Sequence, residues 1–377
     1  MKELFFLDQN IIYLNHGSYG ACPKPVFDDY QSWQKKIEYQ PVQFLSKDIY
    51  KYLEHSREAL GNYVKCDKND LIFYANPSSA INTIISNLKL TINDEVLMST
   101  HEYGALIRAW KKSAKIKGFK VIEQHIKLPL STEKDFVKEF WSGVNKRTKV
   151  IFLSQITSAT ALIFPVKQIC ELASKAGIIT IIDGAHVPGH INLNIKNMDC
   201  DFYSGACHKW LCGPKGSSFL YVKKKFQKNF MPLVISWGKY GDDPGPTKFL
   251  QNFQWQGTTD ISSFLTVPSA INFQVKNNWI SIQKECRGLI RKTKDELSDL
   301  FNDEGLSVGG DWLGQMVSFP LPKGKFKNLK FILLNDYRIE VPIFNWRDRE
   351  YIRVSVQAYN KWDDITQLIK ALKTISK

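Results

Sequence analysis

Two side chains that could do chemistry together stand in one stretch of the chain, at positions 183 and 209. Asp183 ends an apolar, β-branched run, residues 178–182, that is typical of a buried parallel strand. Lys209 follows a second strand-like run, residues 201–206, and opens a loop rich in glycine and proline. Because ligands of open α/β sheets bind at the carboxyl ends of strands, both side chains are expected beside a ligand.

An amine and a carboxylate at neighbouring strand ends suit the chemistry of pyridoxal 5′-phosphate (PLP). The amine of Lys209 would form a Schiff base with the aldehyde of PLP. The carboxylate of Asp183 would keep the pyridine nitrogen protonated, so that the ring withdraws electrons. The two residues alone are a weak signal, because an acid at a strand end is commonly a helix cap and most lysines are solvated.

A third element suits a phosphate group. A short apolar strand, residues 71–74, is followed by the small polar turn NPSSAIN at 76–82 and then by apolar residues at helical spacing. A helix that begins directly after a strand and a small-residue turn points free backbone N–H groups and its dipole at a ligand. The commoner alternative is an ordinary helix start capped by a serine.

Strand-like and helix-like segments alternate between residues 70 and 225, which predicts a mostly parallel sheet with helices on both faces. Upstream, Ser56 is expected to cap a helix that runs towards residue 64. The expected strands are 71–74, 94–100, 150–154, 178–183, 201–206 and 217–221.

The last third of the chain predicts a separate small α/β domain. A long helix is expected at 279–301, strands near 316–319 and 351–356, and a terminal helix from Asp363.

Composition limits the class of protein. The chain has 377 residues, 44% of them apolar and 13% aromatic, which is typical of a folded globular protein with sizeable cores. The net charge is +14, but the lysines are scattered, the densest run is 223–225, and no nucleic-acid-binding motif accompanies them. We expect a solvated basic surface that favours anionic small molecules, and no nucleic-acid partner.

Cysteine usage and hydropathy indicate the compartment. The seven cysteines are odd in number and include no CxxC pair, so we expect free thiols in a reducing cytosol and no metal site. No apolar run approaches a membrane span, and the N-terminal residues do not read as a signal peptide. The sequence therefore predicts a soluble cytoplasmic protein without a membrane partner.

Several motifs together resemble the class V aminotransferases, and most closely their isopenicillin N epimerase-like branch. The motifs are NHGSYG, HEYGA, DGAHxPG, CHKWLCGPKG and a final RxSxxxYN, and they span nearly the whole chain. The resemblance implies a fold-type I PLP enzyme with a mostly parallel, seven-stranded sheet in its large domain. It implies an N-terminal arm at 1–20, a large PLP-binding domain at 21–260 and a small α/β domain at 261–377.

The resemblance assigns roles around the cofactor. Lys209 is implied as the Schiff-base lysine and as the acid/base at the substrate Cα, and Asp183 as the partner of the pyridinium nitrogen. His186 would lie against the ring near its phenolic oxygen, and His208 would help to hold the phosphate or cofactor.

Further cofactor contacts follow from the same resemblance. Ser78 and Ser79 match the phosphate loop of the family. Tyr103 aligns with the ring that stacks on the pyridine face, with His101 as the weaker alternative. The ring oxygen would bond Thr157 or Ser158, which remain alternatives, and Ser158 is taken as the candidate.

The remaining roles concern the substrate and a second subunit. Arg353 of the ending motif would grip the substrate carboxylate as a two-pronged fork. Asn15 and His16 of the arm are expected to contact the substrate. Thr258, in FQWQGTTD, would reach the phosphate from the neighbouring subunit, which implies a homodimer with shared active sites.

The reaction is expected to begin with Cα deprotonation of an amino acid. An isopenicillin N epimerase-like reaction is favoured, with His16 or Tyr103 as a second proton donor. The alternatives are a cysteine or cysteine-conjugate C–S lyase, an aminotransferase, and a non-catalytic binding protein. A desulfurase mechanism is disfavoured because no cysteine follows Cys286.

Overall fold

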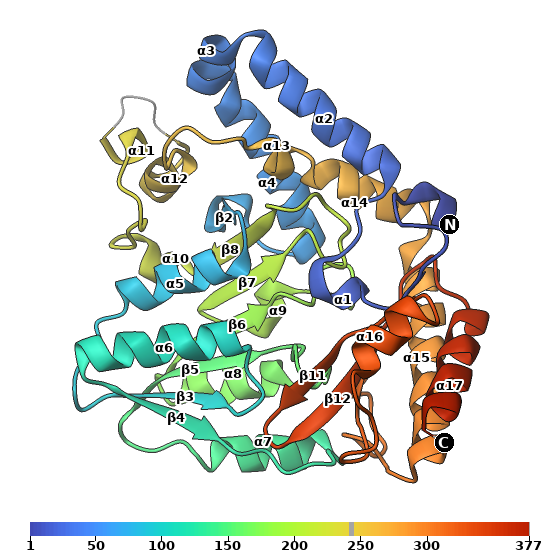
Figure 1. Ribbon diagram of the computed structural model, residues 1–377. Coiled ribbons are helices and arrows are strands. Elements are labelled where there is room, and N and C mark those ends of the chain that lie inside the picture. The colour runs from blue at the N-terminus through green and yellow to red at the C-terminus, as the bar shows by residue number, and fades with distance from the viewer. Residues whose placement is uncertain (241–244, 377) are drawn as a thin grey trace.

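A seven-stranded sheet lies at the centre of the computed structural model, which describes residues 1–240 and 245–376 (Figure 1). Its strand order is β2-β8-β7-β6-β5-β3-β4, and β8 runs in the opposite direction to the other six strands. This arrangement confirms the expected mostly parallel sheet. The strands are β2 (Leu71–Tyr74), β3 (Glu95–Ser99), β4 (Lys120–Gln124), β5 (Thr148–Ser154), β6 (Ile179–Gly184), β7 (Phe202–Ala206) and β8 (Ser218–Val222).

Both faces of the sheet are buried, which explains why its strands read as unbroken apolar runs. In β2, Leu71 and Phe73 belong to one apolar core and Ile72 and Tyr74 to the other, as alternation along a strand requires. Helices cover the two faces (Figure 1). One face carries α5 (Pro77–Asn87), α6 (Gly104–Lys117) and α12 (Lys248–Gln254), and the other carries α4 (Ile49–Val64) and α8 (Val166–Lys175).

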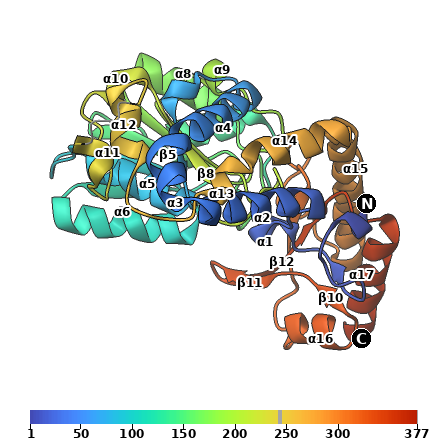
Figure 2. The ribbon, with the colours of Figure 1, turned by 90° about the horizontal axis from the view of Figure 1, so that it is seen from above.

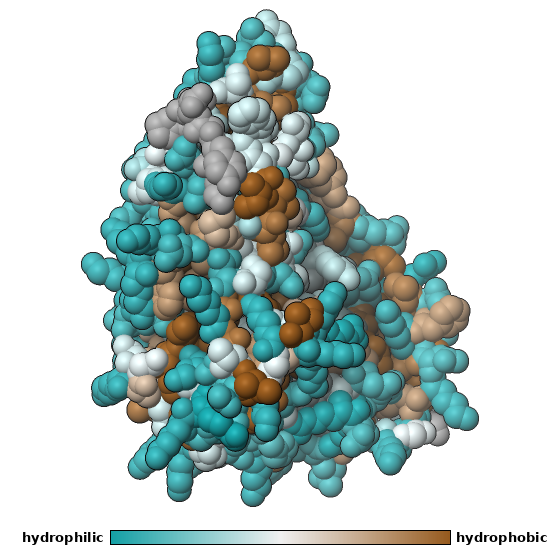
Figure 3. Space-filling view, turned by 90° about the vertical axis from the view of Figure 1, so that its left-hand side faces the viewer, coloured by the Kyte–Doolittle hydropathy of each residue, from teal (hydrophilic) through white to brown (hydrophobic). Residues whose placement is uncertain are grey.

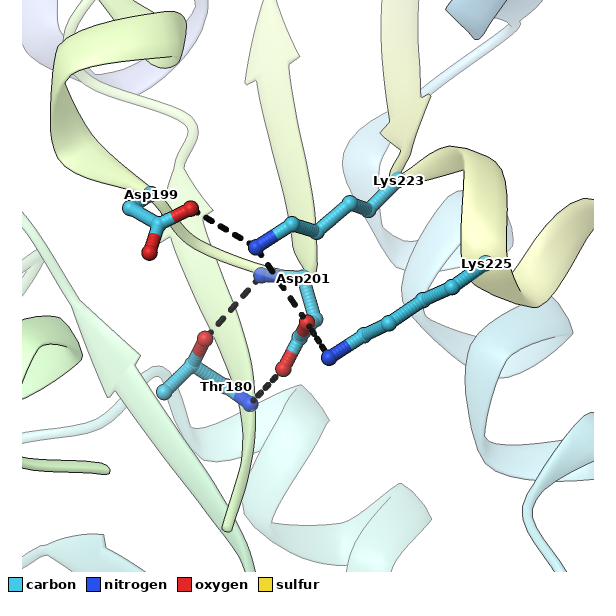
Figure 4. A network of polar contacts seen from close by, with 5 residues as sticks. All are labelled: Thr180, Asp199, Asp201, Lys223 and Lys225. Atoms are coloured by element: carbon cyan, nitrogen blue, oxygen red, sulfur yellow. Dashed lines mark hydrogen bonds and ion pairs between the residues drawn. The ribbon is translucent and has the colours of Figure 1, made fainter. Parts of the chain in front are cut away.

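A charged network fixes the strands at the end of the sheet where β6 and β7 begin (Figure 4). The buried carboxylate of Asp201 accepts a hydrogen bond from the Thr180 backbone N–H at 3.1 Å and pairs with Lys225 Nζ at 2.7 Å. Lys223 bridges Asp199 and the same carboxylate. The basic run at 223–225 is thus largely neutralised by acids of the chain, and it holds the strands that lead to Asp183 and Lys209.

Residues 24–64 contribute a helical layer. Helix α2 (Lys24–Tyr39) and the short turns α3 (Pro41–Gln43) and η2 (Phe44–Asp48) lead directly into α4. The prediction that Ser56 caps a helix is wrong, because α4 already begins at Ile49 and buries Ser56 in its middle. Apolar residues at Ile49, Leu53 and Leu60 continue the buried face across that position.

The C-terminal elements stand to one side of the sheet (Figure 2). A three-stranded antiparallel sheet, ordered β11-β12-β9, packs with α15 (Trp279–Phe301), and α15 contacts α17 (Trp362–Ile375). Upstream, α14 (Val267–Lys276) packs on α2 and α4, and the domain boundary at residue 260 stays a prediction. The strands are β9 (Met316–Pro320), β11 (Ile343–Trp346) and β12 (Arg349–Ser355).

The N-terminal arm joins the two parts of the molecule. Strand β1 (Ile12–Tyr13) pairs in parallel with β10 (Ile339–Glu340), and the short helix α1 (His16–Tyr19) follows. At Gly20, φ is +70°, and a Cβ atom there would lie 2.1 Å from the carbonyl oxygen of His208. Only glycine allows the arm to approach the Lys209 loop so closely.

The other elements are short connections at the surface or lie between the main layers. In the part of the chain that the structure describes, no helix is both long and apolar enough to span a membrane. These other elements are η1 (Lys2–Leu4), η3 (Lys68–Asp70), α7 (Glu133–Trp141), α9 (Ile195–Met198), α10 (Lys224–Gln227), α11 (Trp237–Tyr240), α13 (Ser262–Leu265) and α16 (Leu329–Asn335).

Candidate active site

A cavity of about 400 Å³ opens at the carboxyl ends of the parallel strands. Ser154 ends β5, Asp183 lies near the end of β6, and Lys209 stands in the loop after β7. Seven of the residues predicted from the sequence line this one cavity. They are Ser78, Tyr103, Ser158, Asp183, His186, His208 and Lys209.

The amine of Lys209 stands 3.1 Å from Nε2 of His186. Burial lowers the pKa of Lys209 to about 8, against an ordinary value of 10.5, and the positive charge of Arg353 lowers it further while Asp183 opposes the shift. About a tenth of the amine is therefore uncharged at pH 7, far more than for a solvated lysine. An uncharged amine is the form that can attack a carbonyl or accept a proton.

Trp210 sets the tautomer of His186. Its indole N–H donates a hydrogen bond to Nδ1 of His186 at 3.2 Å, so the proton of the neutral ring is on Nε2, facing the Lys209 amine. Burial, followed by the charges of Lys209 and Arg353, lowers the pKa of His186 far enough to keep the ring neutral. Because an N–H needs an acceptor, this contact favours the uncharged form of Lys209.

Asp183 presents a buried carboxylate to the cavity. Its Oδ1 accepts a hydrogen bond from the backbone N–H of Ala185 at 2.9 Å. Burial raises the pKa of Asp183, while the Ala185 N–H and the nearby Lys209 charge act in the opposite direction. A buried carboxylate with so few donors can accept a further N–H, and a protonated ring nitrogen would supply one.

The start of α5 forms another wall. Ser78 lines the cavity, but Ser79 does not, because its backbone N–H and hydroxyl both bond Oδ1 of Asn76, the residue that caps the helix. The structure thus brings one of the two predicted serines into the cavity. His208 also lines it, and its Nδ1 donates to the Ser217 carbonyl at 2.9 Å.

Arg353, on β12, does not itself line the cavity but lies directly behind two residues that do. Its side chain is buried, Nη1 donates to the Ser158 carbonyl at 2.6 Å, and Nη2 donates to the Ser18 hydroxyl at 2.9 Å. Both partners line the cavity. Within residues 1–240 and 245–376, Nε of Arg353 has no hydrogen-bond partner. A buried guanidinium with an unpaired N–H beside a cavity is suited to an incoming carboxylate.

The arm residues lie behind the cavity wall. His16 is fully buried, with Nδ1 at 2.9 Å from the Tyr359 hydroxyl and Nε2 at 3.1 Å from the Lys209 carbonyl oxygen. Both ring nitrogens are occupied, so the prediction that His16 contacts the substrate is not supported by its position. Asn15 bonds Glu340 and accepts from the Ser18 hydroxyl, so it orients Ser18 and does not line the cavity.

One residue of each pair of alternatives that the sequence left open lines the cavity, and the role of each stays a prediction. Tyr103, the N-cap of α6, lines the cavity with 46% of its side chain exposed. His101 is buried outside the lining against Trp346. Thr157 is also buried outside it, and its hydroxyl accepts a hydrogen bond from the Leu162 backbone, whereas Ser158 lines the cavity.

Thr258 does not belong to this cavity in the single chain. It is exposed to solvent in the segment after α12 and is absent from the lining. A contact with the cofactor in its own chain is thus not formed, and the predicted contact across a dimer remains a prediction.

Comparison with known proteins decides the family. A family model described as "Aminotransferase class-V" matches residues 12–368. The chain belongs to the class-V aminotransferase family. An isopenicillin N epimerase of Amycolatopsis lactamdurans is 32% identical, over 100% of this chain and 98% of that protein. An L-cysteine desulfhydrase of Arabidopsis thaliana is 24% identical, over 97% of this chain and 87% of that protein.

Solved structures confirm the fold. The apo structure of a cysteine desulfurase from Thermococcus onnurineus NA1 matches with a TM-score of 0.86 at 20% identity, covering 100% of this chain and 97% of that one. The protein is therefore a fold-type I enzyme of the class-V family, as the sequence motifs predicted.

The cofactor of the class-V family is PLP, and the cavity fits it. Lys209 supplies an amine with a lowered pKa, and Asp183 supplies a buried carboxylate that can accept an N–H. The start of α5 supplies the Ser78 hydroxyl and the positive end of the helix dipole, which suit a phosphate. These residues come from different strand ends and meet around one space of small-molecule size.

Sequence reasoning missed one buried acid, which lies behind the cavity wall and bonds a residue that lines the cavity, Ser154. Glu102, between the two ring candidates of HEYGA, is 3% exposed and accepts hydrogen bonds from the Ser99 hydroxyl and from the backbone and hydroxyl of Ser154. Burial raises the pKa of Glu102 to about 7, despite these serine donors, and the charge of Asp183 raises it further. Only the apolar strand before it, residues 95–99, hinted that this acid turns inward.

Replacing Glu102 by glutamine is expected to flatten the pH dependence of stability. Between pH 4.5 and about 7 the unfolded chain ionises this carboxyl while the folded protein keeps it protonated, so the free energy of unfolding falls as the pH rises. The loss is on the order of 3 kcal/mol and is complete above pH 7. Urea unfolding at pH 5 and pH 8 measures it, with the exposed Glu285→Gln as control. Equal pH slopes for wild type and Glu102→Gln would contradict the assignment.

Proposed function

We propose that this PLP-dependent enzyme removes the Cα proton of an amino-acid substrate and epimerises that centre. One observation carries the proposal: the amine of Lys209, with a pKa lowered to about 8, shares a cavity with the buried carboxylate of Asp183. A base and an electron sink must meet at one Cα atom for such chemistry.

Each residue has a separate task in the proposed reaction. Lys209 would hold the cofactor through its amine, and the same amine would accept the Cα proton of the substrate. Asp183 would accept the N–H of the cofactor ring and stabilise its positive charge. PLP, when bound, supplies the electron-withdrawing ring that makes the Cα hydrogen acidic. Arg353 binds the substrate carboxylate and fixes which Cα bond faces Lys209.

Epimerisation requires a second proton donor. Tyr103 is the remaining candidate of the two considered, since it lines the cavity and its hydroxyl could return a proton to Cα. The 32% identity to an isopenicillin N epimerase over the full length of this chain supports the same reaction class.

The second candidate is β-elimination by a C–S lyase, and the position of His16 favours it. With His16 bonded outside the cavity, the chain offers fewer second donors, and β-elimination needs only Lys209 and a leaving group at Cβ. The similarity to a relative named L-cysteine desulfhydrase supports this alternative. A persulfide-forming mechanism is not proposed, because no cysteine follows Cys286.

The functional unit is proposed to be a homodimer. Four apolar side chains close to α11 are at least half exposed, and Thr258 follows α12 in an exposed segment. Figure 3 shows brown residues gathered beside the grey segment, on the side of the molecule that carries α5, α6 and α12. A surface of this kind is typical of a contact between subunits. The four side chains are Leu233, Val234, Ile235 and Trp237.

Proton NMR in D₂O tests the reaction. A panel of amino acids that includes cysteine conjugates is incubated with the PLP-loaded enzyme. Loss of the α-proton signal, with both configurations appearing and no new carbon skeleton, is the result expected of an epimerase. Formation of a keto acid with a released thiol would replace epimerisation by β-elimination. No exchange with any amino acid would contradict both readings.

Replacing Arg353 by lysine is expected to raise KM for the amino acid roughly ten- to a hundredfold, with a smaller change in kcat. A lysine keeps the charge but cannot form the two parallel hydrogen bonds of a guanidinium with a carboxylate. Steady-state kinetics measure the split between KM and kcat. Arg349→Lys, on the same strand but paired with Asp303 at the surface, is the matched control. Equal KM values for the two variants would exclude the carboxylate role.

A further inference from the structure

A second buried guanidinium lies away from the Lys209 cavity. Arg57, on α4, is 2% exposed, and its Nη1 donates to Oε1 of Gln254 at 2.7 Å. Among the described residues, its Nε and Nη2 have no hydrogen-bond partner. Burial lowers the pKa of Arg57 to about 10, which still leaves it charged at neutral pH. Buried charges in proteins are normally paired, so this cation lacks its expected partner.

Arg57 lines a cavity of about 510 Å³ with largely aromatic and aliphatic walls. The rings of Phe73 and Phe264 stack in this wall with centroids 5.3 Å apart, and Trp255 lines it as well. The side-chain amide nitrogen of Gln254 is also buried without a partner in the described chain. Three unpaired N–H-bearing atoms are therefore buried in side chains that line one largely apolar space.

Two acids in the described part of the chain near this cavity have other partners. Glu54, on the same helix, forms an ion pair with Lys68 at 3.0 Å. Asp260, which lines the same cavity, accepts hydrogen bonds from the Gln34 amide at 2.9 Å and from the Ser262 backbone at 2.8 Å. The charge of Glu54 opposes the effect of burial on the pKa of Arg57, but among the described residues neither carboxylate forms a hydrogen bond or ion pair with this guanidinium. An external oxyanion can therefore complete the site.

We propose that this cavity is a binding site for a carboxylate attached to an apolar, ring-sized group, with Arg57 as its anchor and Gln254 as a second donor. A planar guanidinium with two free N–H groups on one side matches the two oxygens of a carboxylate. The carboxylate can come from a free small molecule or from an acidic side chain or C-terminus of a second copy of this chain. The proposal does not rest on the proposed reaction: the two cavities share Ala75, Lys215 and Gly216, but Arg57 and Gln254 line only this one.

Calorimetric titration of the PLP-loaded wild-type protein with phenylacetate tests the small-molecule source. Phenylacetate is expected to bind at least about tenfold more tightly than its neutral analogue phenylacetamide. Arg57→Met is expected to lose that preference, whereas Arg353→Met, which removes the other buried guanidinium described above, is expected to keep it. Equal phenylacetate binding by wild type and Arg57→Met would overturn the assignment.

Two further measurements complete the test. In crystals of the wild-type protein soaked with 4-bromophenylacetate, the anomalous bromine signal is expected in the Arg57 cavity, a result that needs no variant. If phenylacetate does not bind to the wild-type protein, sedimentation of wild type and Arg57→Met tests the other source, a carboxylate of a second copy of this chain. A dimer dissociation constant raised by about tenfold or more in the variant would assign the carboxylate to the second copy. Absence of both effects would overturn the proposal.

Discussion

Replacement of Lys209 by alanine is expected to reduce turnover by about 10³-fold or more, because one change removes both the covalent anchor of the cofactor and the base at Cα. The neighbouring fold should survive, since the Lys209 side chain contributes one polar contact, to His186, while its backbone is held by His16. Steady-state assays with the substrate found by NMR give the loss, and thermal unfolding of the cofactor-free protein checks the fold.

A matched control for that loss lies six residues further along. Lys215 also lines the cavity, but its amine donates to the Gly20 carbonyl at 3.0 Å, so Lys215→Ala is expected to retain most of the activity. Added methylamine should partly restore exchange of the α-proton in Lys209→Ala, because a small amine can replace the missing base. Activity of Lys209→Ala within tenfold of wild type would remove Lys209 from its role.

Replacement of Asp183 by asparagine is expected to lower kcat by about a hundredfold or more while leaving the protein folded. The amide can keep the hydrogen bond from the Ala185 N–H, but it carries no charge to hold a proton on a ring nitrogen. Stopped-flow measurement of α-proton loss isolates the affected step. KM should change less than kcat, because Asp183 does not contact the substrate in this proposal.

Asp201→Asn is the companion variant. Asp201 is a buried acid at the start of the neighbouring strand, where it pairs with lysines and with Thr180. Its replacement is expected to lower the melting temperature with little effect on kcat in the folded enzyme. The opposite pattern, a stable Asp201→Asn with lost activity and an active Asp183→Asn, would contradict the assignment of the site to this end of the sheet.

The central fold was predictable because its strands are buried on both faces. The apolar run at 71–74 coincides with β2, and the helix expected at 279–301 coincides with α15. Strand β4, KVIEQ, was not predicted, because it lies at the edge of the sheet and its residues are mixed and partly exposed. The short strands β1 and β10 were missed as well, because each consists of two residues that only the other stabilises.

The site was predictable where chemistry restricts the residue type. An amine and a carboxylate at strand ends can be read from a sequence, and Asp183 and Lys209 do share a cavity. Contacts that depend on long-range packing cannot be read in this way. The sequence around Trp210 gives no sign that its indole N–H fixes the tautomer of His186. The buried Glu102 is bonded to Ser154, which lies about fifty residues away in the sequence, at the end of β5.

The link between β1 and β10 has a consequence for biosynthesis. A ribosome releases this chain from its N-terminus, so Ile12 stays without its strand partner until Ile339 has emerged. The arm that buries His16 against the Lys209 loop and Tyr359 therefore cannot complete its contacts until residue 359 has emerged. Because Ser18 of this arm lines the cavity, the cavity wall is finished only after most of the chain has been synthesised.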